Sequence, residues 1–387
     1  MRLRAASGSS EANDAVEAGT AAATEAMAGL NGRRPSMIIV YASVRYDLPA
    51  LLGAIRDVTG DVPLVGETST GHFRGAALTG PASGVAVLAM TSGSYRFGVA
   101  SVERLSAGAE HAGMQLAGSA RAAIGPERTP YATLVLFADG LATEHQGLVG
   151  GIHRVAGAAV PIVGGGAADD RRLSQTFVFH DDRVLSDAAV AVWIGSDHPL
   201  RVTVGHGWHA IGLPLLVTKT NGQIVSEIAD RPAREVFDEH IRRSDRAEPN
   251  RVGPGDYYSR HALGLIEPDG THLIRGVFIG DDEMIHTFVP LPVYAAVQVM
   301  ACDEGELLAV SHDVAERAVA GRDASVLLVF SCVSRLDVLQ DRGAEEAIRL
   351  QAAAANVPIF GLYTYGEFAR TSNVAGSHNS AVTAVAL

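Results

Sequence analysis

Two glycine turns of the sequence carry a dense set of hydroxyl groups. They are Gly66-Glu67-Thr68-Ser69-Thr70-Gly71 and Gly361-Leu362-Tyr363-Thr364-Tyr365-Gly366, which share the pattern G-x-x-[ST]-x-G. Each turn ends a short apolar run that opens with Val-Pro, and proline at the start of a strand removes no needed hydrogen bond. In open α/β sheets, ligands bind beside the loops at the carboxyl ends of strands. The pattern therefore predicts a small-molecule site on these loops.

Phosphate is a poor candidate for the ligand of these loops. A P-loop needs the pattern G-x-x-x-x-G-K-[ST], and no lysine lies in the two turns or in the related turn Val160-Pro161-Ile162-Val163-Gly164-Gly165-Gly166. Hydroxyl groups instead favour a neutral or zwitterionic ligand that is held by hydrogen bonds.

We expect the ligand site at the carboxyl-terminal turn. Tyr363 and Tyr365 lie two residues apart, so in extended backbone their phenols would point the same way, with Thr364 opposed. Arg335 follows another strand of the same unit, and with Glu367 it would place opposite charges at the mouth of a pocket. An amino acid, which carries an ammonium and a carboxylate, matches this arrangement.

Two alternatives to that site remain open. A site at the amino-terminal turn would use its hydroxyl residues, which are Thr68, Ser69 and Thr70. Arg335 could also be a surface arginine that pairs with Asp337 or Asp341, in which case it would have no role in binding.

The sequence does not predict an enzyme. Ser69 and His72 lie three residues apart, but there is no G-x-S-x-G elbow and no recognisable base with a third group to orient it. Cys332 ends an apolar run, where a cysteine is more often a small core residue than a nucleophile. A hydrolase or transferase that uses the hydroxyl-rich loops remains an alternative.

Metal and haem sites have little support, and we expect no metal and no cofactor. The pairs His206 with His209 and Asp169 with Asp170 lack the H-E-x-x-H or paired-cysteine spacing of common metal sites. Haem would need an axial ligand such as histidine. The candidates are His72, His206, His209 and His240.

The turns belong to a repeated pattern of elements. Apolar runs at 37–42, 133–138 and 325–330 each precede a helical pattern and one of the three glycine turns, and a further apolar run follows each turn. Continuous apolar runs are typical of strands that are buried on both faces. We predict an α/β fold of two domains, in which internally repeated strand–helix–strand units form mixed sheets covered by helices.

The same pattern predicts the organisation of the chain. We expect a disordered start at 1–10, an amino-terminal domain at 11–205 and a carboxyl-terminal domain at 206–387. The shared register of the first and third turns predicts an approximate two-fold relation between their units. Two hairpins are also expected, one around 91–94 and one around Thr220-Asn221-Gly222.

Composition limits the classes of function. The net charge of −12 argues against a nucleic-acid or anionic-membrane surface. No apolar run is long enough to span a bilayer, the start lacks the apolar segment of a signal peptide, and two cysteines do not make a disulfide framework. These features predict a cytoplasmic protein. The single lysine and high alanine content are typical of a GC-rich bacterial genome.

Several of these motifs resemble the FIST sensory domains. The turns at Gly66–Gly71 and Val160–Gly166 are similar to the amino-terminal FIST domain. The stretch Val217-Thr218-Lys219-Thr220-Asn221-Gly222 with Arg231-Pro232-Ala233 resembles the start of the carboxyl-terminal FIST domain, and Ser331-Cys332-Val333-Ser334-Arg335 with Gly361–Glu367 resembles its end. The resemblance extends from about residue 11 to residue 387.

The resemblance implies an intracellular sensory protein that binds a small, amino acid-like ligand. It also implies a signalling partner, such as a sensor kinase or a chemoreceptor. Some relatives resemble haem-containing nitric-oxide sensors, so a haem-binding gas sensor is the second hypothesis. His72 departs from the family pattern, which more often has an acid at that position.

Overall fold

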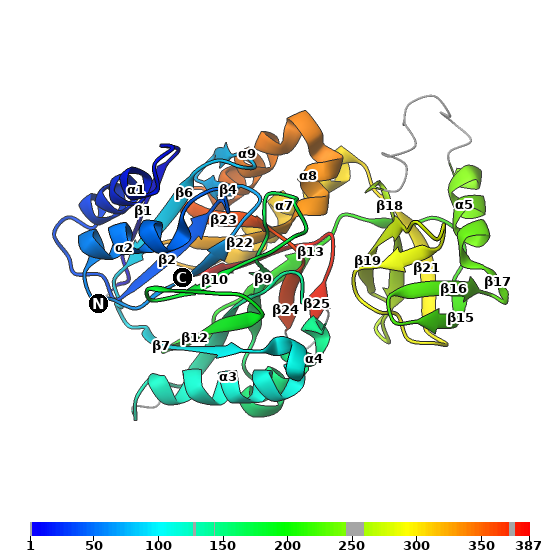
Figure 1. Ribbon diagram of the computed structural model, residues 1–387, viewed down its shortest axis with the longest axis horizontal. Coiled ribbons are helices and arrows are strands. Elements are labelled where there is room, and N and C mark those ends of the chain that lie inside the picture. Colours follow the sequence, from blue (N-terminus) through cyan, green and yellow to red (C-terminus); the bar gives the residue numbers. More distant parts are fainter. Residues whose placement is uncertain (1, 127–128, 143, 245–258, 371–375) are drawn as a thin grey trace.

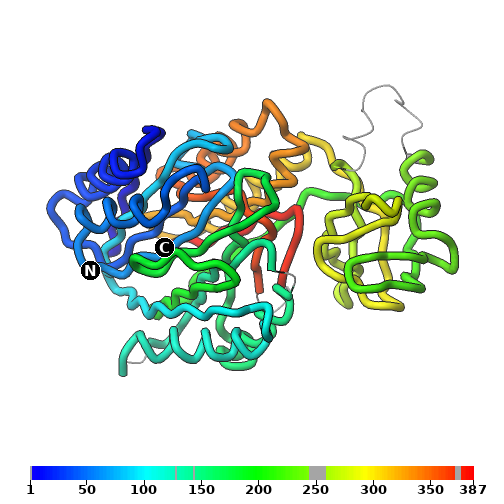
Figure 2. Tube along the Cα trace, viewed as in Figure 1, coloured from blue at the N-terminus to red at the C-terminus, as the bar shows by residue number. Residues whose placement is uncertain are grey.

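Three mixed sheets surround one apolar core, and a separate closed sheet stands to one side of them (Figure 1; Figure 2). The computed structural model describes residues 2–126, 129–142, 144–244, 259–370 and 376–387. The predicted fold class is confirmed, because internally repeated strand–helix–strand units form the three mixed sheets and helices cover them.

The first unit provides most of the first sheet. Its elements are β1 (Ala5–Ser10), α1 (Ala15–Gly29), β2 (Met37–Ala42), α2 (Leu48–Thr59), β3 (Leu64–Thr68), β4 (His72–Arg74), β5 (Ala77–Thr79) and β6 (Val85–Met90). β2 and β3 are parallel, while β6 pairs antiparallel with both β1 and β2. The two helices begin at Asp14 and Asp47, whose side chains accept N–H groups of the first turn.

The second and third units repeat this order. The second consists of β7 (Arg96–Glu103), η1 (Leu105–Ala107), α3 (Ala109–Ala123), β8 (Tyr131–Ala138), α4 (His145–Ala156), β9 (Ile162–Gly166), β10 (Val178–His180), β11 (Arg183–Leu185) and β12 (Ala188–Ser196). The third consists of β13 (Val202–Gly205), α7 (Glu304–Val319), β22 (Leu327–Cys332), α8 (Val333–Leu339), η3 (Gln340–Arg342), α9 (Gly343–Ala354), β23 (Ile359–Thr364), β24 (Glu367–Arg370), β25 (Ser377–His378) and β26 (Val382–Ala386).

Each unit contributes a short hairpin to a sheet that another unit builds. β4–β5 joins β23 of the third unit, β24–β25 joins β9 of the second, and β10–β11 joins β3 of the first. The sheets are therefore β1-β6-β2-β3-β10-β11, β7-β12-β8-β9-β24-β25 and β13-β26-β22-β23-β4-β5. The two-fold relation that we predicted between the first and third units is wrong. The first unit gives its hairpin to the third, the third gives its hairpin to the second, and the second gives its hairpin to the first, so the three units are related in a cycle.

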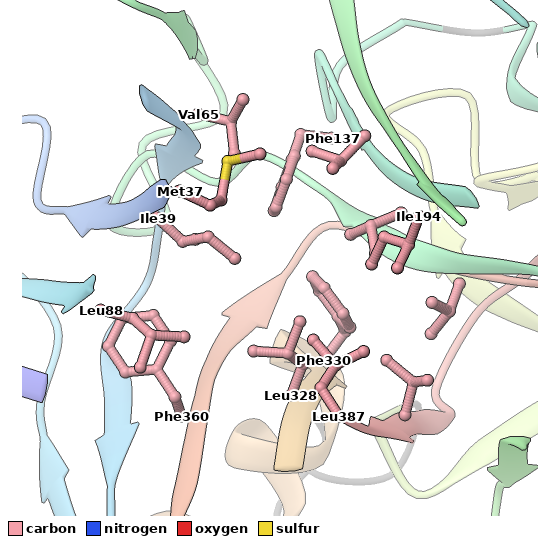
Figure 3. Close-up of a cluster of buried hydrophobic side chains, with 14 of the residues drawn as sticks. Met37, Ile39, Val65, Leu88, Phe137, Ile194, Leu328, Phe330, Phe360 and Leu387 are labelled. Atoms are coloured by element: carbon pink, nitrogen blue, oxygen red, sulfur yellow. The ribbon is translucent and has the colours of Figure 1, made fainter. Parts of the chain in front are cut away.

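The inner faces of the three sheets pack on a common core, which Figure 3 shows in close-up. Tyr41, Phe137 and Phe330 occupy matching positions on β2, β8 and β22 and lie across this core. The centroids of the Tyr41 and Phe137 rings are 6.5 Å apart, and those of Phe137 and Phe330 are 6.1 Å apart. The outer faces pack against α1 and α2, α3 and α4, and α7 and α9.

A separate domain is inserted between β13 and α7, and we call residues 207–302 the inserted domain. It consists of β14 (His209–Ala210), β15 (Leu215–Asn221), β16 (Ile224–Ile228), β17 (Arg231–Pro232), α5 (Ala233–Ser244), β18 (His261–Ile266), β19 (His272–Ile279), β20 (Ile285–Thr287) and β21 (Ala296–Ala301). Its strands are antiparallel, and β18 pairs with β21 to close the sheet. The predicted hairpin at Thr220-Asn221-Gly222 is confirmed, because β15 pairs with β16.

The first glycine of each turn allows a close approach of two parallel strands. A Cβ atom added at Gly66 would lie 1.9 Å from the Val40 carbonyl oxygen, and one at Gly164 would lie 1.8 Å from that of Leu136. Real Cβ atoms do not come so close to backbone, so this contact dictates glycine at these positions.

Two expectations about the first hundred residues are wrong. Ala5–Ser10, expected to be disordered, forms β1, because β6 offers its backbone a pairing partner. The hairpin expected around 91–94 does not form, because β6 pairs in the first sheet and β7 in the second. The division into domains at residue 205 stays a prediction; β13 ends there, and the sheets exchange strands across it. None of the described helices could cross a membrane.

Candidate ligand-binding site

The three glycine turns hydrogen-bond to one another in a ring. The Thr70 N–H donates to the Tyr363 carbonyl at 3.2 Å, and the Tyr365 N–H donates to the Gly166 carbonyl at 2.8 Å. The Ala168 N–H donates to the Thr68 carbonyl at 2.8 Å and completes the ring. The carboxyl ends of the parallel strands of all three sheets therefore meet at one place. In open α/β sheets, ligands bind beside such ends.

Between the apolar core and this ring, the inward-facing side chains of the sheets are polar. The strand register places Glu67 opposite Tyr41, and His72 opposite Leu362, on inward faces of the sheets. Ser69 lies two residues beyond Glu67, and Thr383 lies opposite Phe330 on β26. We call the following five residues, all at most 1% exposed, the buried polar layer: Tyr41, Glu67, Ser69, His72 and Thr383.

Glu367 and Thr364 lie at the same level in the third unit. The Thr364 hydroxyl donates to Glu367 Oε1 at 2.8 Å, and the Ala381 N–H donates to Oε2 at 3.1 Å. Burial raises the pKa of Glu367 to about 8. Burial and the neighbouring Glu367 raise the pKa of the Cys332 thiol to about 12. A thiol with so high a pKa stays protonated at neutral pH, so Cys332 is not an activated nucleophile.

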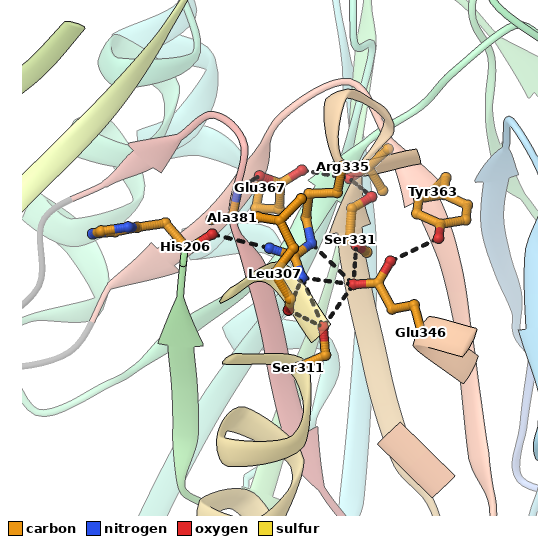
Figure 4. Close-up of polar contacts among 10 residues, drawn as sticks. His206, Leu307, Ser311, Ser331, Arg335, Glu346, Tyr363, Glu367 and Ala381 are labelled. Carbon is orange, nitrogen blue, oxygen red and sulfur yellow. Dashed lines mark hydrogen bonds and ion pairs between the residues drawn. The ribbon is translucent and has the colours of Figure 1, made fainter. Parts of the chain in front are cut away.

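Arg335 is the largest fully buried side chain of the described residues, and all three of its guanidinium nitrogens donate hydrogen bonds (Figure 4). Nε donates to Glu346 Oε1 at 2.9 Å, and Nη1 donates to the His206 carbonyl at 3.0 Å. Nη2 donates to the Leu307 carbonyl at 2.9 Å and to the Ser311 hydroxyl at 2.7 Å. These contacts leave it no exposed donor for a ligand. Its partner is Glu346 rather than Asp337 or Asp341.

The two tyrosines that we expected to form one wall are separated. The Tyr363 hydroxyl donates to Glu346 Oε2 at 2.6 Å, on the outer face of the third sheet (Figure 4). The Tyr365 hydroxyl donates to Asp169 Oδ1 at 2.6 Å, at the ring of turns. The expectation was wrong because β23 ends at Thr364, so Tyr365 lies in the turn and does not continue the alternation of the strand.

A cavity of about 440 Å³ lies over the ring of turns, where the second and third units meet the inserted domain. We call it the interdomain cavity. One wall comes from the loop before α4, the start of α8 and the segment around Tyr365 and Asn379. The inserted domain supplies the opposite wall with Gln223, Gly276, Phe288 and Val289.

The interdomain cavity has an ion pair and several hydrogen-bonding groups in its lining. Arg171 and Asp337 form a salt bridge in which both side chains remain about two-fifths exposed. The Oδ1 atom of Asn379 is buried and has no hydrogen-bond partner among the described residues. The Ser334 hydroxyl donates to that of Ser380 at 2.9 Å. Charges of both signs and an unpaired amide oxygen are therefore available to a ligand.

Two family models together match most of the chain. The FIST N domain matches residues 36–231, and the FIST C domain matches residues 233–370. The chain belongs to the FIST family. FIST domains are associated with sensory signalling and small-ligand binding.

The curated proteins that this FIST protein matches are named only as uncharacterised proteins. An uncharacterised protein of Mycobacterium tuberculosis is 27% identical over 231 residues, which cover 53% of this chain and 55% of that protein. An uncharacterised protein of Methanocaldococcus jannaschii is 25% identical over 122 residues, which cover 30% of this chain and 24% of that protein. The chain thus spans about half or less of these relatives. A solved cyanuric acid hydrolase from A. caulinodans aligns over 99% of both chains with 10% identity and a TM-score of 0.38, too low to support an argument.

Of the residues that the sequence predicted for the site of this FIST protein, only Tyr365 lines the interdomain cavity. Thr68, Ser69, Thr70, Tyr363, Thr364 and Glu367 are buried beneath or beside the ring, and the Thr70 side chain lies next to Tyr365. Sequence reasoning missed Arg171, Asp337 and Asn379. Arg171 directly follows the acidic end of the second glycine turn, which was the available signal.

The four histidines considered as haem ligands do not line the interdomain cavity. His72 is in the buried polar layer, the His209 Nδ1 atom contacts Glu306, and the His240 Nδ1 atom contacts the Val236 carbonyl. His206 Nδ1 accepts the Trp208 N–H at 2.9 Å. His145 does line the cavity, and its Nε2 atom lies 2.8 Å from the Asp139 carbonyl oxygen.

Proposed function

We propose that this FIST protein is a cytoplasmic sensor that binds a small amino acid-like ligand in the interdomain cavity. The observation that carries the proposal is the pairing of Arg171 with Asp337 in the lining of a cavity that also contains Asn379, whose Oδ1 atom has no partner among the described residues. Concave sites with a few convergent polar groups are the usual form of small-molecule sites.

An amino acid carries a positive and a negative group, so it could take the place of each partner in the contact between Arg171 and Asp337. Its carboxylate would accept hydrogen bonds from the Arg171 guanidinium, which suits a bidentate pair. Its ammonium would donate to the Asp337 carboxylate and to the Asn379 Oδ1 atom. Separating the two partners of an exposed ion pair costs about 0–1 kcal/mol. The ligand would therefore gain two charged contacts for a small loss of free energy in the protein.

The ligand would carry a signal because the two walls of the cavity belong to different domains. Phe288 and Val289 of the inserted domain line the cavity together with Tyr365 and Ser334 of the third unit. In the described residues, a hydrogen bond of 3.1 Å from Arg275 to the Ser377 carbonyl also joins the two sides. A bound ligand would fix the position of the inserted domain, and a signalling partner such as a sensor kinase or chemoreceptor would recognise that position.

The test is a panel of free amino acids in thermal-shift and calorimetric titrations of the purified protein. Arg171→Ala should weaken the binding of the responding amino acid by about ten- to a hundredfold, because a hydrogen bond to a charged group is worth about 1.5–3 kcal/mol. Arg154→Ala is the control, since Arg154 pairs with Glu110 at 2.8 Å on an exposed face. The proposal fails if no amino acid binds, or if the two variants bind equally well.

We further propose that the protein acts without catalysis and without a resident cofactor. Within the described part of the chain, the Ser69 hydroxyl and both ring nitrogens of His72 have no hydrogen-bond partner, so no nucleophile–base pair is formed there. Turnover of generic esters that disappears in Ser69→Ala would contradict the first proposal. A Soret absorption band in the natively purified protein would contradict the second and favour the haem-binding gas sensor.

A further inference from the structure

The buried polar layer contains hydrogen-bonding atoms that the described residues leave without partners. They are the Tyr41 hydroxyl, both carboxyl oxygens of Glu67, the Ser69 hydroxyl, both ring nitrogens of His72 and the Thr383 hydroxyl. Buried polar side chains in native proteins almost always have a hydrogen-bond partner, either in the protein or in ordered water, and each exception needs an explanation. A concentration of unpaired atoms in one layer therefore points to an occupant.

Glu67 makes the strongest case within the layer. Its side chain is fully buried and directly opposite Tyr41, whose pKa is raised by burial and by the neighbouring Glu67. The matching positions in the other two units hold Gly165 and Leu362. The fold therefore does not require an acid at this position, and a leucine fills it in the third unit.

The layer favours the uncharged forms of its side chains. Burial raises the pKa of Glu67 well above its ordinary value, which favours the protonated carboxyl. Burial and the nearby Arg74 lower the pKa of His72 to about 4, so its imidazole is neutral. A protonated carboxyl and a neutral imidazole each offer one donor and one acceptor.

A ligand that matches the buried polar layer must therefore be uncharged and must present a hydrogen-bond donor next to a hydrogen-bond acceptor. An amide group does so, because its N–H and its C=O can both bond to a protonated carboxyl. Charged ligands are disfavoured because no compensating charge lies in the layer, and purely apolar ligands would leave the same atoms unpaired.

We propose that the buried polar layer is a second binding site, which takes a small uncharged molecule that carries an amide group. Glu67 and His72 hold the amide, and the hydroxyls of Tyr41 and Ser69 bond to its remaining polar atoms. The layer is enclosed beneath the ring of turns, so the ligand enters when that ring opens. This site is independent of the ligand proposed for the interdomain cavity.

Acetamide and acetone form a matched pair of probes, because they have similar shapes and only acetamide donates hydrogen bonds. Acetamide should raise the melting temperature of the wild-type protein above the value in equimolar acetone. Glu67→Leu, which copies Leu362, should weaken acetamide binding at least about tenfold, whereas Glu67→Gln keeps a donor and an acceptor and should retain it. Arg171→Ala should leave the acetamide effect unchanged, which separates this site from the cavity.

A crystal structure of the acetamide-soaked protein provides the second measurement. Density for acetamide between Glu67 and His72 supports the proposal. Three outcomes overturn it: equal effects of acetamide and acetone, unchanged acetamide binding in Glu67→Leu, or a layer that contains only water or a direct hydrogen bond between Glu67 and Tyr41.

Discussion

Arg335→Ala should unfold the protein more easily rather than weaken a ligand contact. The guanidinium and the Glu346 carboxylate are both fully buried and approach to 2.8 Å. Removing the arginine leaves a buried carboxylate without its cation and leaves the Leu307 and His206 carbonyls without their donor. Loss of one partner of a buried ion pair costs about 3–5 kcal/mol, so we expect the free energy of unfolding to fall by that amount.

Urea unfolding of the ligand-free protein measures this change. Arg154→Ala, which breaks an exposed pair, should cost about 0–1 kcal/mol. The double variant Arg335→Met with Glu346→Leu should recover much of the loss, because no charge is left buried without a partner. If Arg335→Ala unfolds like the wild type and loses affinity for an amino acid, the arginine belongs to a ligand site and the structural interpretation is refuted.

Two further predictions test the packing and the electrostatics. Gly164→Ala should lower the free energy of unfolding by about 1–3 kcal/mol, since the new Cβ atom would overlap the Leu136 carbonyl oxygen, whereas Gly53→Ala on open helix surface should raise it by about 0.5–1 kcal/mol. Because burial raises the pKa of Glu367 to about 8, the contribution of this carboxyl to stability is complete below its ordinary pKa and is lost as pH rises toward 8. Glu367→Gln should remove that decline in urea titrations between pH 5 and pH 8, and an unchanged slope would contradict the assignment.

The repeated units could be predicted from the sequence because their signals are local. A Val-Pro run that leads into a glycine turn indicates a strand and its end wherever it occurs. The exchange of hairpins could not be predicted, because nothing within β4 or β24 specifies that its partner is a strand of another unit. The same limit explains the wrong hairpin around 91–94, where two neighbouring strands pair in different sheets.

The candidate site was predicted only in part, for a related reason. Tyr365 was identified because it lies on a turn at the end of a strand. Arg335 was misplaced because its burial depends on α7 and on Glu346 of α9, which cover it from outside its own strand–turn segment. Arg171 and Asp337 meet only in the folded chain, and no sequence spacing joins them.

The cyclic fold explains how one architecture can hold two different sites. Each unit needs glycine at the close strand contact and apolar residues in the core, and these requirements leave the ends of the strands free to vary. The residues at one matching position are Glu67, Gly165 and Leu362, and those at another are His72, Val178 and Glu367. Chemistry at the ring of turns is therefore asymmetric although the backbone repeats. Because only the third unit carries the inserted domain, the interdomain cavity forms on one side of the ring. The ligands that we propose for this cavity and for the buried polar layer would therefore be recognised independently.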